Sequence, residues 1–301
     1  MTMPENTRAG FVALIGAPNA GKSTLMNRFV GTKVSIVTHK VQTTRSRVLG
    51  VVIEDQDQIV FVDTPGIFAP KRRLDRAMVR AAWDGAKDAD EVVLLIDAQA
   101  GLKGDVAAII ENLKETNRKA IVAINKIDKV KRENLLALTD QLNQTGICKE
   151  IFMISALNGD GAADLLKHLC NAMPEGHWLF PEDQITDMPL RLMAAEVTRE
   201  KLFINVHQEL PYELAVETET WEEFKNGSVK IEQTIYVRRE SQRSIILGKN
   251  GQRIKKIGAD AREELIEMFD RPVHLFLYVK VRERWEENSN FYTQWGLEFN
   301  A

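Results

Sequence analysis

The chain has 301 residues, of which 44% are apolar and 28% charged, and these values are typical of about two globular domains rather than a disordered chain. Its formal net charge of −3 excludes a uniformly basic nucleic-acid coat protein but allows a local basic site. The two cysteines, Cys148 and Cys170, exclude a disulfide framework and a multi-cysteine zinc site and favour a cytoplasmic location.

Five short apolar runs in the first 173 residues predict the strands of an α/β domain. Because the runs show no polar alternation, they suit strands buried on both faces of a mostly parallel sheet. The expected strands are Phe11–Ile15, Gln58–Val62, Val92–Ile96, Ala120–Ile124 and Ile151–Ile154. Helical patterns such as Asp105–Glu115 and Arg132–Gln144 lie between them, so we expect helices on both faces and a ligand at the carboxyl edge of the sheet.

A proline-rich stretch divides the chain into two domains. Pro174, Pro181 and Pro189 each prevent helix continuation, so residues 174–190 are predicted to link a domain of residues 1–173 to a domain of residues 191–285. The second domain has the mixed α+β order α-β-β-α-α-β, with elements at Leu192–Leu210, Tyr212–Glu219, Val229–Arg238, Ser241–Leu247, Gln252–Phe269 and His274–Val281. Residues 286–301 form a tail.

Large aromatic residues are concentrated near the end of the chain. Trp285, Phe291, Tyr292 and Trp295 can either cover the core of the second domain or stack on nucleic-acid bases. We favour packing for these residues.

The first strand leads into a phosphate-binding loop. The segment from Gly16 to Ser23 fits the pattern G-x-x-x-x-G-K-[ST], and it follows a strand and opens a helix as that pattern requires. Glycines let backbone N–H groups approach a phosphate, and the positive end of the following helix faces the anion. Lys22 is predicted to contact the β- and γ-phosphates. The nucleotide-binding residues expected here are Gly16, Ala17, Pro18, Asn19, Ala20, Gly21, Lys22, Ser23 and Thr24.

Two further segments are predicted to meet Mg²⁺ and the γ-phosphate. Asp63 ends an apolar run and can bind the hydration shell of Mg²⁺, and Gly66 can offer its N–H to the γ-phosphate. A threonine between residues 38 and 45 would close on Mg²⁺ when a triphosphate is bound. The sequence leaves Thr43 and Thr44 open as that ligand, and we favour Thr44. The expected metal ligands are Ser23, Thr44 and Asp63, and the expected catalytic residues are Lys22, Thr44 and Gly66.

The segment Asn125-Lys126-Ile127-Asp128 predicts that the base is guanine. The Asp128 carboxylate can accept two hydrogen bonds from the ring N–H and the amine of guanine, whereas adenine offers no such pair. The stem of Lys126 can lie over the base plane. Ser155 and Ala156 follow the next strand and can present a backbone N–H to the guanine carbonyl.

A basic turn in the second domain predicts contact with single-stranded RNA. Gly248-Lys249-Asn250-Gly251 joins two predicted helices, and such a turn lets a nucleic-acid backbone approach closely. Residues 238–256 contain seven Lys or Arg and one acidic residue, within an acidic chain, and this favours a phosphate contact over a merely solvated helix face. The expected RNA-binding residues are Ile246, Gly248, Lys249, Asn250, Gly251, Arg253 and Lys256, with Ile245 and Ile254 beside Ile246 in an apolar groove.

These motifs together resemble one known family. The segments G-x-P-N-x-G-K-S, Q-T-T-R, D-T-P-G, N-K-x-D and I-S-A are similar to those of Era-type P-loop GTPases, and the second domain resembles a type II KH domain. The resemblance covers nearly the whole chain. It implies Mg²⁺-dependent hydrolysis of GTP to GDP and phosphate, which is slow without a partner because Ile67 replaces a water-orienting glutamine. In related members an asparagine at the position of Asn19 helps to hold K⁺.

The resemblance also implies partners and a location. These are GTP and GDP, the single-stranded 3′ end of 16S rRNA and the 30S subunit during its assembly, for a monomer in the cytoplasm. Peripheral contact with the inner face of the cell membrane is implied as well, although no amphipathic anchor in the sequence predicts it. Two alternatives stay open: a metabolic nucleotide kinase, and a passive RNA-binding module with a vestigial nucleotide site.

Overall fold

The structure, a computed structural model, describes residues 7–38, 40, 43–206 and 210–301. Backbone packing divides the chain into two units. The first unit contains the residues up to Ser35, Thr44–Asp187 and Trp295–Ala301. The second unit contains Ile36–Thr43 and Met188–Gln294. The chain therefore passes from one unit to the other at four peptide bonds, one of which joins Thr43 to Thr44.

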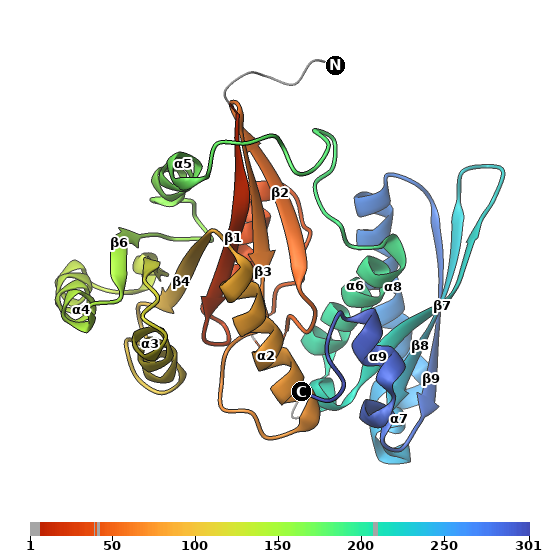
Figure 1. Ribbon diagram of the computed structural model, residues 1–301. Coiled ribbons are helices and arrows are strands. Elements are labelled where there is room, and N and C mark those ends of the chain that lie inside the picture. Colours follow the sequence, from red (N-terminus) through yellow and green to blue (C-terminus); the bar gives the residue numbers. More distant parts are fainter. Residues whose placement is uncertain (1–6, 39, 41–42, 207–209) are drawn as a thin grey trace. The chain divides into compact units, whose positions relative to one another are not determined.

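A six-stranded sheet forms the centre of the first unit (Figure 1). Its strand order is β2-β3-β1-β4-β5-β6, and β2 alone runs antiparallel to its neighbour. The strands are β1 (Arg8–Gly16), β2 (Val48–Glu54), β3 (Asp57–Asp63), β4 (Glu91–Asp97), β5 (Ala120–Asn125) and β6 (Cys148–Met153). Because β1, β3, β4 and β5 are parallel, their carboxyl ends bring the loops that follow them to one edge.

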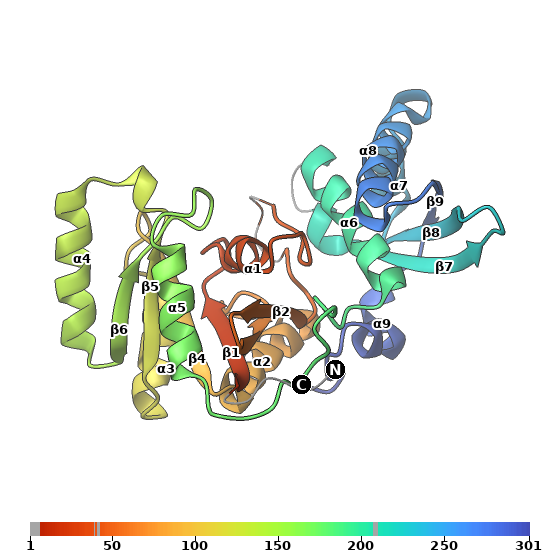
Figure 2. The same cartoon turned by 90° about the horizontal axis from the view of Figure 1, so that it is seen from above.

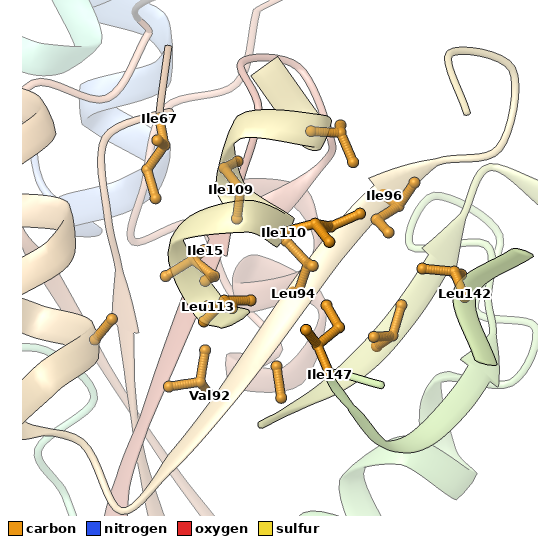
Figure 3. Packing of buried hydrophobic residues seen from close by; sticks show 14 of the residues in the cluster. Ile15, Ile67, Val92, Leu94, Ile96, Ile109, Ile110, Leu113, Leu142 and Ile147 are labelled. Carbon is orange, nitrogen blue, oxygen red and sulfur yellow. The ribbon is translucent and has the colours of Figure 1, made fainter. Parts of the chain in front are cut away.

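Helices cover both faces of this sheet (Figure 2). They are α1 (Lys22–Val30), α2 (Arg73–Asp88), α3 (Asp105–Glu115), α4 (Arg132–Thr145) and α5 (Ala162–Ala172). Side chains of α2, α3 and α4 share one core cluster with the strands, which includes Ile15, Leu94, Ile110 and Leu142 (Figure 3). Helices α1 and α5 lie on the other face. The α/β class with a mostly parallel sheet is confirmed.

Strand β2 is the element that the apolar runs did not predict. It pairs along its whole length with β3, and the peptide N–H of Val51 donates to Ile185 O at 2.9 Å. Its residues Val48–Val52 are buried although it lies at the sheet edge, because the segment after α5 returns along it.

The proline-rich segment after α5 packs closely against the first unit. The fully buried side chain of Gln58 donates to Phe180 O at 2.8 Å, and its Oε1 accepts the N–H groups of Leu179 and Phe180. Trp178 donates to Gln56 O at 3.0 Å. Residues up to Asp187 consequently belong to the first unit, and the packing boundary lies at Met188.

The described residues of the second unit form three strands and three longer helices (Figure 1). They are α6 (Leu190–Asn205), β7 (Ala215–Glu223), β8 (Val229–Val237), α7 (Glu240–Leu247), α8 (Gln252–Phe269) and β9 (Val273–Val281). The sheet order is β7-β8-β9, with β7 antiparallel and β9 parallel to β8. The order α-β-β-α-α-β is confirmed, and α6, α7 and α8 contribute side chains to its two core clusters.

The bounds of α6 and β7 differ from the expected ones by more than one residue, whereas those of β8, α7, α8 and β9 agree within one residue. Helix α6 ends at Asn205 rather than at residue 210, and part of the expected extension lies outside the described residues. Tyr212 lies in a short 3₁₀ turn, Leu210–Glu213, so β7 begins three residues later than expected, at Ala215. Proline at position 211 lacks the N–H that a ladder needs, and this favours the turn over a strand.

The four large aromatic residues near the end of the chain, Trp285, Phe291, Tyr292 and Trp295, are packed. Trp285 and Phe291 meet edge to face with ring centres 5.6 Å apart, and Trp285 donates to Glu213 O at 2.9 Å. Phe291 and Tyr292 are buried, and Tyr292 lies in α9 (Ser289–Gln294). Trp295 belongs to the first unit, where the Arg45 guanidinium lies 5.4 Å from its ring centre.

No helix within the described ranges has the length and apolar character needed to cross a membrane.

Candidate nucleotide-binding site and nucleic-acid interface

The loop between β1 and α1 is built around positions that only glycine fits. Gly21 has φ of 102°, and a Cβ there would lie 2.2 Å from Asn125 Nδ2. A Cβ on Gly16 would lie 2.5 Å from Leu95 O. Helix α1 begins immediately after, at Lys22, so its first N–H groups and its positive end face the loop, as an anion site requires.

Lys22 is buried at the base of this loop. Its Nζ donates to Gly16 O at 3.1 Å and to Ala17 O at 3.2 Å. Burial lowers the pKa of Lys22 to about 8, although the Asp63 carboxylate acts to raise it. A phosphate in the loop would give this ammonium a negative partner in place of two neutral carbonyls.

The three expected metal ligands lie in mutual contact. Ser23 Oγ donates to Asp63 Oδ2 at 2.6 Å and lies 3.0 Å from Thr44 Oγ1. Thr43 Oγ1 instead lies 2.7 Å from Thr38 Oγ1 and donates to Lys40 O at 2.8 Å. The structure therefore brings Thr44, and not Thr43, to Ser23 and Asp63.

These oxygen ligands suit Mg²⁺. Asp63 is fully buried, and burial raises its pKa, while Lys22 and the hydroxyl groups of Ser23, Ser35 and Thr44 act to lower it. Within the described residues, Asp63 Oδ1 has no hydrogen-bond partner. A buried carboxylate oxygen without a donor, beside two hydroxyl groups, fits a hard divalent cation that completes its shell with phosphate and water.

The segment after Asp63 lies directly on the phosphate-binding loop. A Cβ on Gly66 would lie 2.9 Å from both N and Cα of Pro18, and Ile67 N donates to Gly16 O at 3.0 Å. The side chain of Ile67 is buried in the core cluster of Figure 3, so it cannot orient a water molecule. Only a residue without a Cβ allows this close approach at position 66.

Asn125 connects the phosphate-binding loop to the loop after β6. Its Nδ2 donates to Ala20 O at 2.8 Å, and its Oδ1 accepts the N–H groups of Lys126 and Ala156, also at 2.8 Å each. Lys126 Nζ donates to Asn19 O at 2.7 Å and pairs with Asp97 Oδ2 at 2.6 Å. The N–H of Ala156 is thus directed at Asn125 and not at an open space.

Asp128 is exposed beside this junction. Its Oδ1 accepts a hydrogen bond from Ser155 Oγ at 2.7 Å, which orients the carboxylate. An exposed, oriented carboxylate is suited to accept the two guanine donors.

Three residues of the site were missed by the sequence reasoning. Ser35 Oγ donates to Asp63 Oδ2 at 2.8 Å, Asp97 pairs with Lys126, and Arg28 Nε donates to Ala156 O at 2.6 Å. Asp97 ends an apolar run and so carried a signal, whereas Ser35 and Arg28 belong to no motif. In the loop before Thr43, residues 39, 41 and 42 lie outside the described residues.

The basic turn of the second unit has the geometry of a helix–turn–helix junction. Gly248 has φ of 70°, and a Cβ there would lie 2.7 Å from Arg253 Cβ. Asn250 has φ of 51° in a short 3₁₀ turn, Lys249–Gly251. Both Lys249 and Asn250 are exposed, so the turn is accessible to a phosphate.

The basic residues around this turn differ in whether they are exposed or already paired within the protein. Arg238 pairs with Glu213 and Glu286, and Arg253 donates to Ile245 O. Lys249, Lys255 and Lys256 are exposed.

One expected RNA contact is buried instead. The side chain of Ile246 has no exposed area and lies in the core of the second unit, whereas Ile245 is 43% exposed. Successive residues of a helix point about 100° apart, so the candidate apolar contact on α7 is Ile245 rather than Ile246.

Comparison with known families agrees with both units. A family model described as 50S ribosome-binding GTPase matches residues 11–126, and one described as KH domain matches residues 209–286.

Whole-chain relatives cover nearly the full length. The chain is 60% identical to GTPase Era of Agrobacterium fabrum over 97% of this chain and 92% of that protein. It is 57% identical to GTPase Era of Caulobacter vibrioides, with 98% of each covered. Two solved structures match with a TM-score of 0.91 and 43% identity over 96% of this chain and 99% of theirs. They are a single-residue variant of Aquifex aeolicus Era bound to GDP and AlF₄⁻, and Era with MgGDPNP and nucleotides 1506–1542 of 16S ribosomal RNA.

The phosphate-binding loop, the contacting side chains of Ser23, Thr44 and Asp63, and the α-β-β-α-α-β unit with its glycine turn define a P-loop GTPase joined to a KH domain. Such a protein binds GTP and hydrolyses it. The identity to the curated relatives over almost the whole chain places this protein in the Era GTPase family.

Proposed function

We propose that this chain is a GTP-dependent switch that binds the 3′ region of 16S rRNA through its KH domain and acts in assembly of the 30S subunit. The observation that carries the proposal is its match over 96% of its length to an Era structure with MgGDPNP and 16S nucleotides 1506–1542. The family model whose description refers to the 50S subunit covers only residues 11–126, without the KH domain.

The residues of the first unit have defined tasks in this proposal. Ser23, Thr44 and Asp63 hold Mg²⁺, which supplies neutralising charge at the phosphates when it is bound. Lys22 neutralises the β- and γ-phosphates, and the Gly66 N–H meets the γ-phosphate. The mutual contacts of Ser23, Thr44 and Asp63 support the first assignment.

Asp128 selects guanine in this proposal, and Asn125 and Lys126 hold the loops around it. The hydrogen bond from Ser155 to Asp128 and the two bonds to Asn125 Oδ1 support these assignments.

K⁺ is proposed as a second cation at Asn19, whose φ of 63° turns the loop at its outer end. We expect GTP hydrolysis to be faster in potassium than in sodium buffer, as measured by phosphate release. Equal turnover in the two buffers would remove K⁺ from the proposal.

A monomeric cytoplasmic protein is the proposed form in the cell. The free thiols of Cys148 and Cys170 support a reducing compartment. Flotation of the chain with vesicles of anionic lipid would test the peripheral membrane contact, and recovery in the soluble fraction would argue against it.

The function is tested by crosslinking the chain to RNA in the presence of small ribosomal subunits, with GTP or with GDP. We expect the 3′ region of 16S rRNA to be the main crosslinked segment and its yield to depend on the nucleotide. Transfer of the γ-phosphate to a small acceptor would favour a nucleotide kinase. Nucleotide binding without hydrolysis in the presence of subunits would favour a passive RNA-binding module.

A further inference from the structure

The guanidinium of Arg28 in α1 contacts the loop that follows β6. Its Nε donates to Ala156 O at 2.6 Å, and its Nη2 donates to Leu157 O. Both carbonyls belong to residues 155–160, which we call the base loop. The helix dipole favours a cation in the last turn of α1, where Arg28 lies. The dipole does not explain why both donors are directed at one neighbouring loop.

The two carbonyls lie in the middle of a turn whose ends are hydrogen-bonded to each other. Asn158 N donates to Ser155 Oγ at 3.2 Å, and Gly159 N donates to Ser155 O at 2.7 Å. Because the Ser155 hydroxyl accepts from Asn158, its single proton is directed at Asp128 Oδ1, 2.7 Å away. A shift of this turn would therefore move the hydroxyl group that orients Asp128.

The outer part of the base loop is exposed. Ser155 and Ala156 are 1% and 2% exposed, but Leu157 is 69% exposed. An exposed turn buries little apolar area, so hydrogen bonds to its backbone are needed to hold it in one position.

Gly159 leaves the space that the guanidinium occupies. It has φ of 101°, and a Cβ there would lie 2.7 Å from Arg28 Nη1. The base loop thus accommodates Arg28 at a glycine and binds it at two carbonyls.

Helix α1 also begins at the phosphate-binding loop. Lys22 and Ser23 lie in its first turn, and Arg28 lies in its last turn. A single helix of nine residues has a fixed rise of about 1.5 Å per residue. Arg28 therefore holds the base loop at a fixed distance from the two residues that face the phosphates.

We infer that Arg28 is a positioning residue for guanine selection, because it holds the base loop where Ser155 can orient Asp128. The inference rests on the proposed role of Asp128 in selecting guanine. Loss of the two hydrogen bonds from Arg28 should destabilise the ordered turn by about 5- to 100-fold. Base discrimination would then fall while phosphate binding is kept, since Lys22 and Ser23 are unaltered.

The test compares the binding of GDP and inosine diphosphate to the full chain with Mg²⁺. The base of inosine lacks the exocyclic amine of guanine, so the ratio of the two affinities measures the hydrogen bond from that amine to Asp128. Arg28→Met keeps an unbranched stem without a donor. We expect it to lower GDP affinity by about 5-fold or more and to bring the two affinities closer together. Arg28→Lys should keep part of the ratio, because an ammonium can donate to a carbonyl but lacks the planar fork.

Turnover separates positioning from general damage. In Arg28→Met we expect KM for GTP to rise, whereas kcat and the Mg²⁺ concentration at half-maximal rate should change by less than about 2-fold. Because the Arg28 side chain is exposed, we expect the variants to fold, which circular dichroism checks. A variant that is merely destabilised would lose affinity for GDP and inosine diphosphate equally, and this result would count against the inference.

Arg118→Met is the matched control. Arg118 also donates to two backbone carbonyls, those of Lys87 and Ala89, at 3.1 and 2.9 Å. It precedes the amino end of β5, whereas the phosphate-binding loop follows the carboxyl end of β1. Its replacement is expected to leave the ratio of affinities unchanged.

Asp128→Ala separates this inference from the function on which it rests. If Asp128→Ala leaves the ratio unchanged, Asp128 does not select guanine and both proposals fall. If it lowers the ratio and Arg28→Met does not, guanine selection by Asp128 stands and the positioning role of Arg28 is overturned. Equal changes in Arg28→Met and Arg118→Met would also overturn that role. A ratio that falls in Asp128→Ala and Arg28→Met but not in Arg118→Met supports it.

Discussion

Asp63 and Asp128 carry the same side chain, but one is buried and the other exposed. This difference suits a metal ion at Asp63 and a nucleotide base at Asp128. Asp63 is fully buried among hydroxyl groups, whereas Asp128 is exposed and accepts a hydrogen bond from Ser155. A buried carboxylate gains most from a compact cation, and an exposed one can exchange water for the paired donors of a base.

Replacing Asp128 by asparagine tests the choice of base. The change puts a donor where guanine also has a donor, so we expect GTP affinity to fall by about 100-fold, as the loss of two hydrogen bonds to a charged group implies. Xanthosine nucleotides should then compete, because their base carries an acceptor there. Competition binding with GTP, XTP and ATP measures this ranking. Asp160→Asn is a control, since Asp160 offers Ser155 its backbone oxygen and not its side chain. An unchanged ranking would contradict guanine recognition by Asp128.

At the residue scale, the chemistry of a motif predicts which segment contacts the ligand. It does not predict which of two adjacent residues in that segment makes the contact. The glycines, Lys22, Asp63 and Asn125 could be inferred because their tasks allow few other residue types. The sequence left Thr43 and Thr44 open, with Thr44 favoured, and the structure supplies a reason for Thr44, because Thr43 bonds to Thr38 and Lys40 instead. Adjacent residues differ in direction, and only packing sets that direction.

At the scale of elements, the turn between α7 and α8 tests the RNA interface. Gly248→Asp adds a negative charge and a Cβ that would lie 2.7 Å from Arg253 Cβ, at a φ of 70°. We expect RNA binding to be lost and GTP affinity to change by less than about 2-fold, because the two sites share no residues. Fluorescence anisotropy with a single-stranded 16S 3′ fragment measures the effect.

Gly227→Asp provides the matched control for this substitution. Gly227 lies in the turn between β7 and β8 with φ of 82°, and a Cβ there meets no atom within 4 Å. It carries the same backbone strain and the same added charge outside the basic turn. RNA binding that survives in Gly248→Asp, or fails equally in both variants, would argue against a specific contact at the turn.

The segment after α5 was predicted to be a linker, and the structure packs it against the first unit. Its contribution to the stability of that unit can be tested at Gln58. Gln58→Ala removes three hydrogen bonds to Leu179 and Phe180 and should lower the free energy of unfolding by about 2–4 kcal/mol. Chemical denaturation measures this value, and limited proteolysis should show faster cleavage near Phe180. Gln56→Ala is the control, because only the backbone oxygen of Gln56 accepts a bond from Trp178. Equal stability of the two variants would show that this segment adds nothing to the first unit.

A helix or strand could be predicted from the sequence where its own residues show the pattern of a buried element. Five of the six strands of the first unit came from continuous apolar runs, and α8 was predicted at its observed bounds. Strand β2 was not predicted. It is an antiparallel edge strand that pairs with β3 and bonds to the distant residue Ile185, and its own sequence gives no sign of that contact. The ends of α6 and β7 depend on the intervening turn, which competes with both elements.

At the scale of the whole molecule, residues that follow the second unit in the sequence pack in the first unit. The last seven residues pack in the first unit, where Trp295 is 3% and Leu297 7% exposed. Arg73 lies 4.6 Å from the ring centre of Phe299, and Arg80 pairs with Glu298 at 3.2 Å. Both arginines belong to α2, so the carboxyl end of the chain stabilises the helix that follows Asp63 and Gly66.

Removal of residues 295–301 should therefore destabilise the first unit and not the second. Loss of a buried tryptophan costs about 3 kcal/mol or more, which lowers the Tm of a unit of this size by roughly 5–10 °C. Scanning calorimetry of the full-length and truncated chains measures the shift. A chain that ends at Phe299 is the control, because it keeps Trp295, Leu297 and Phe299. An unaltered Tm after removal of all seven residues would mean that this packing contributes no stability.

The packing of residues 295–301 has a consequence for folding during synthesis on the ribosome. A chain is synthesised from its amino end, so the sheet that holds the phosphate-binding loop is made first, yet Trp295 can reach Arg45 only after residues 188–294 of the second unit have been made. The nucleotide-binding unit can reach its full stability only when residues 295–301 have left the exit tunnel. A nascent chain arrested before Trp295 would then expose α2 to proteases that a chain with residues 295–301 resists.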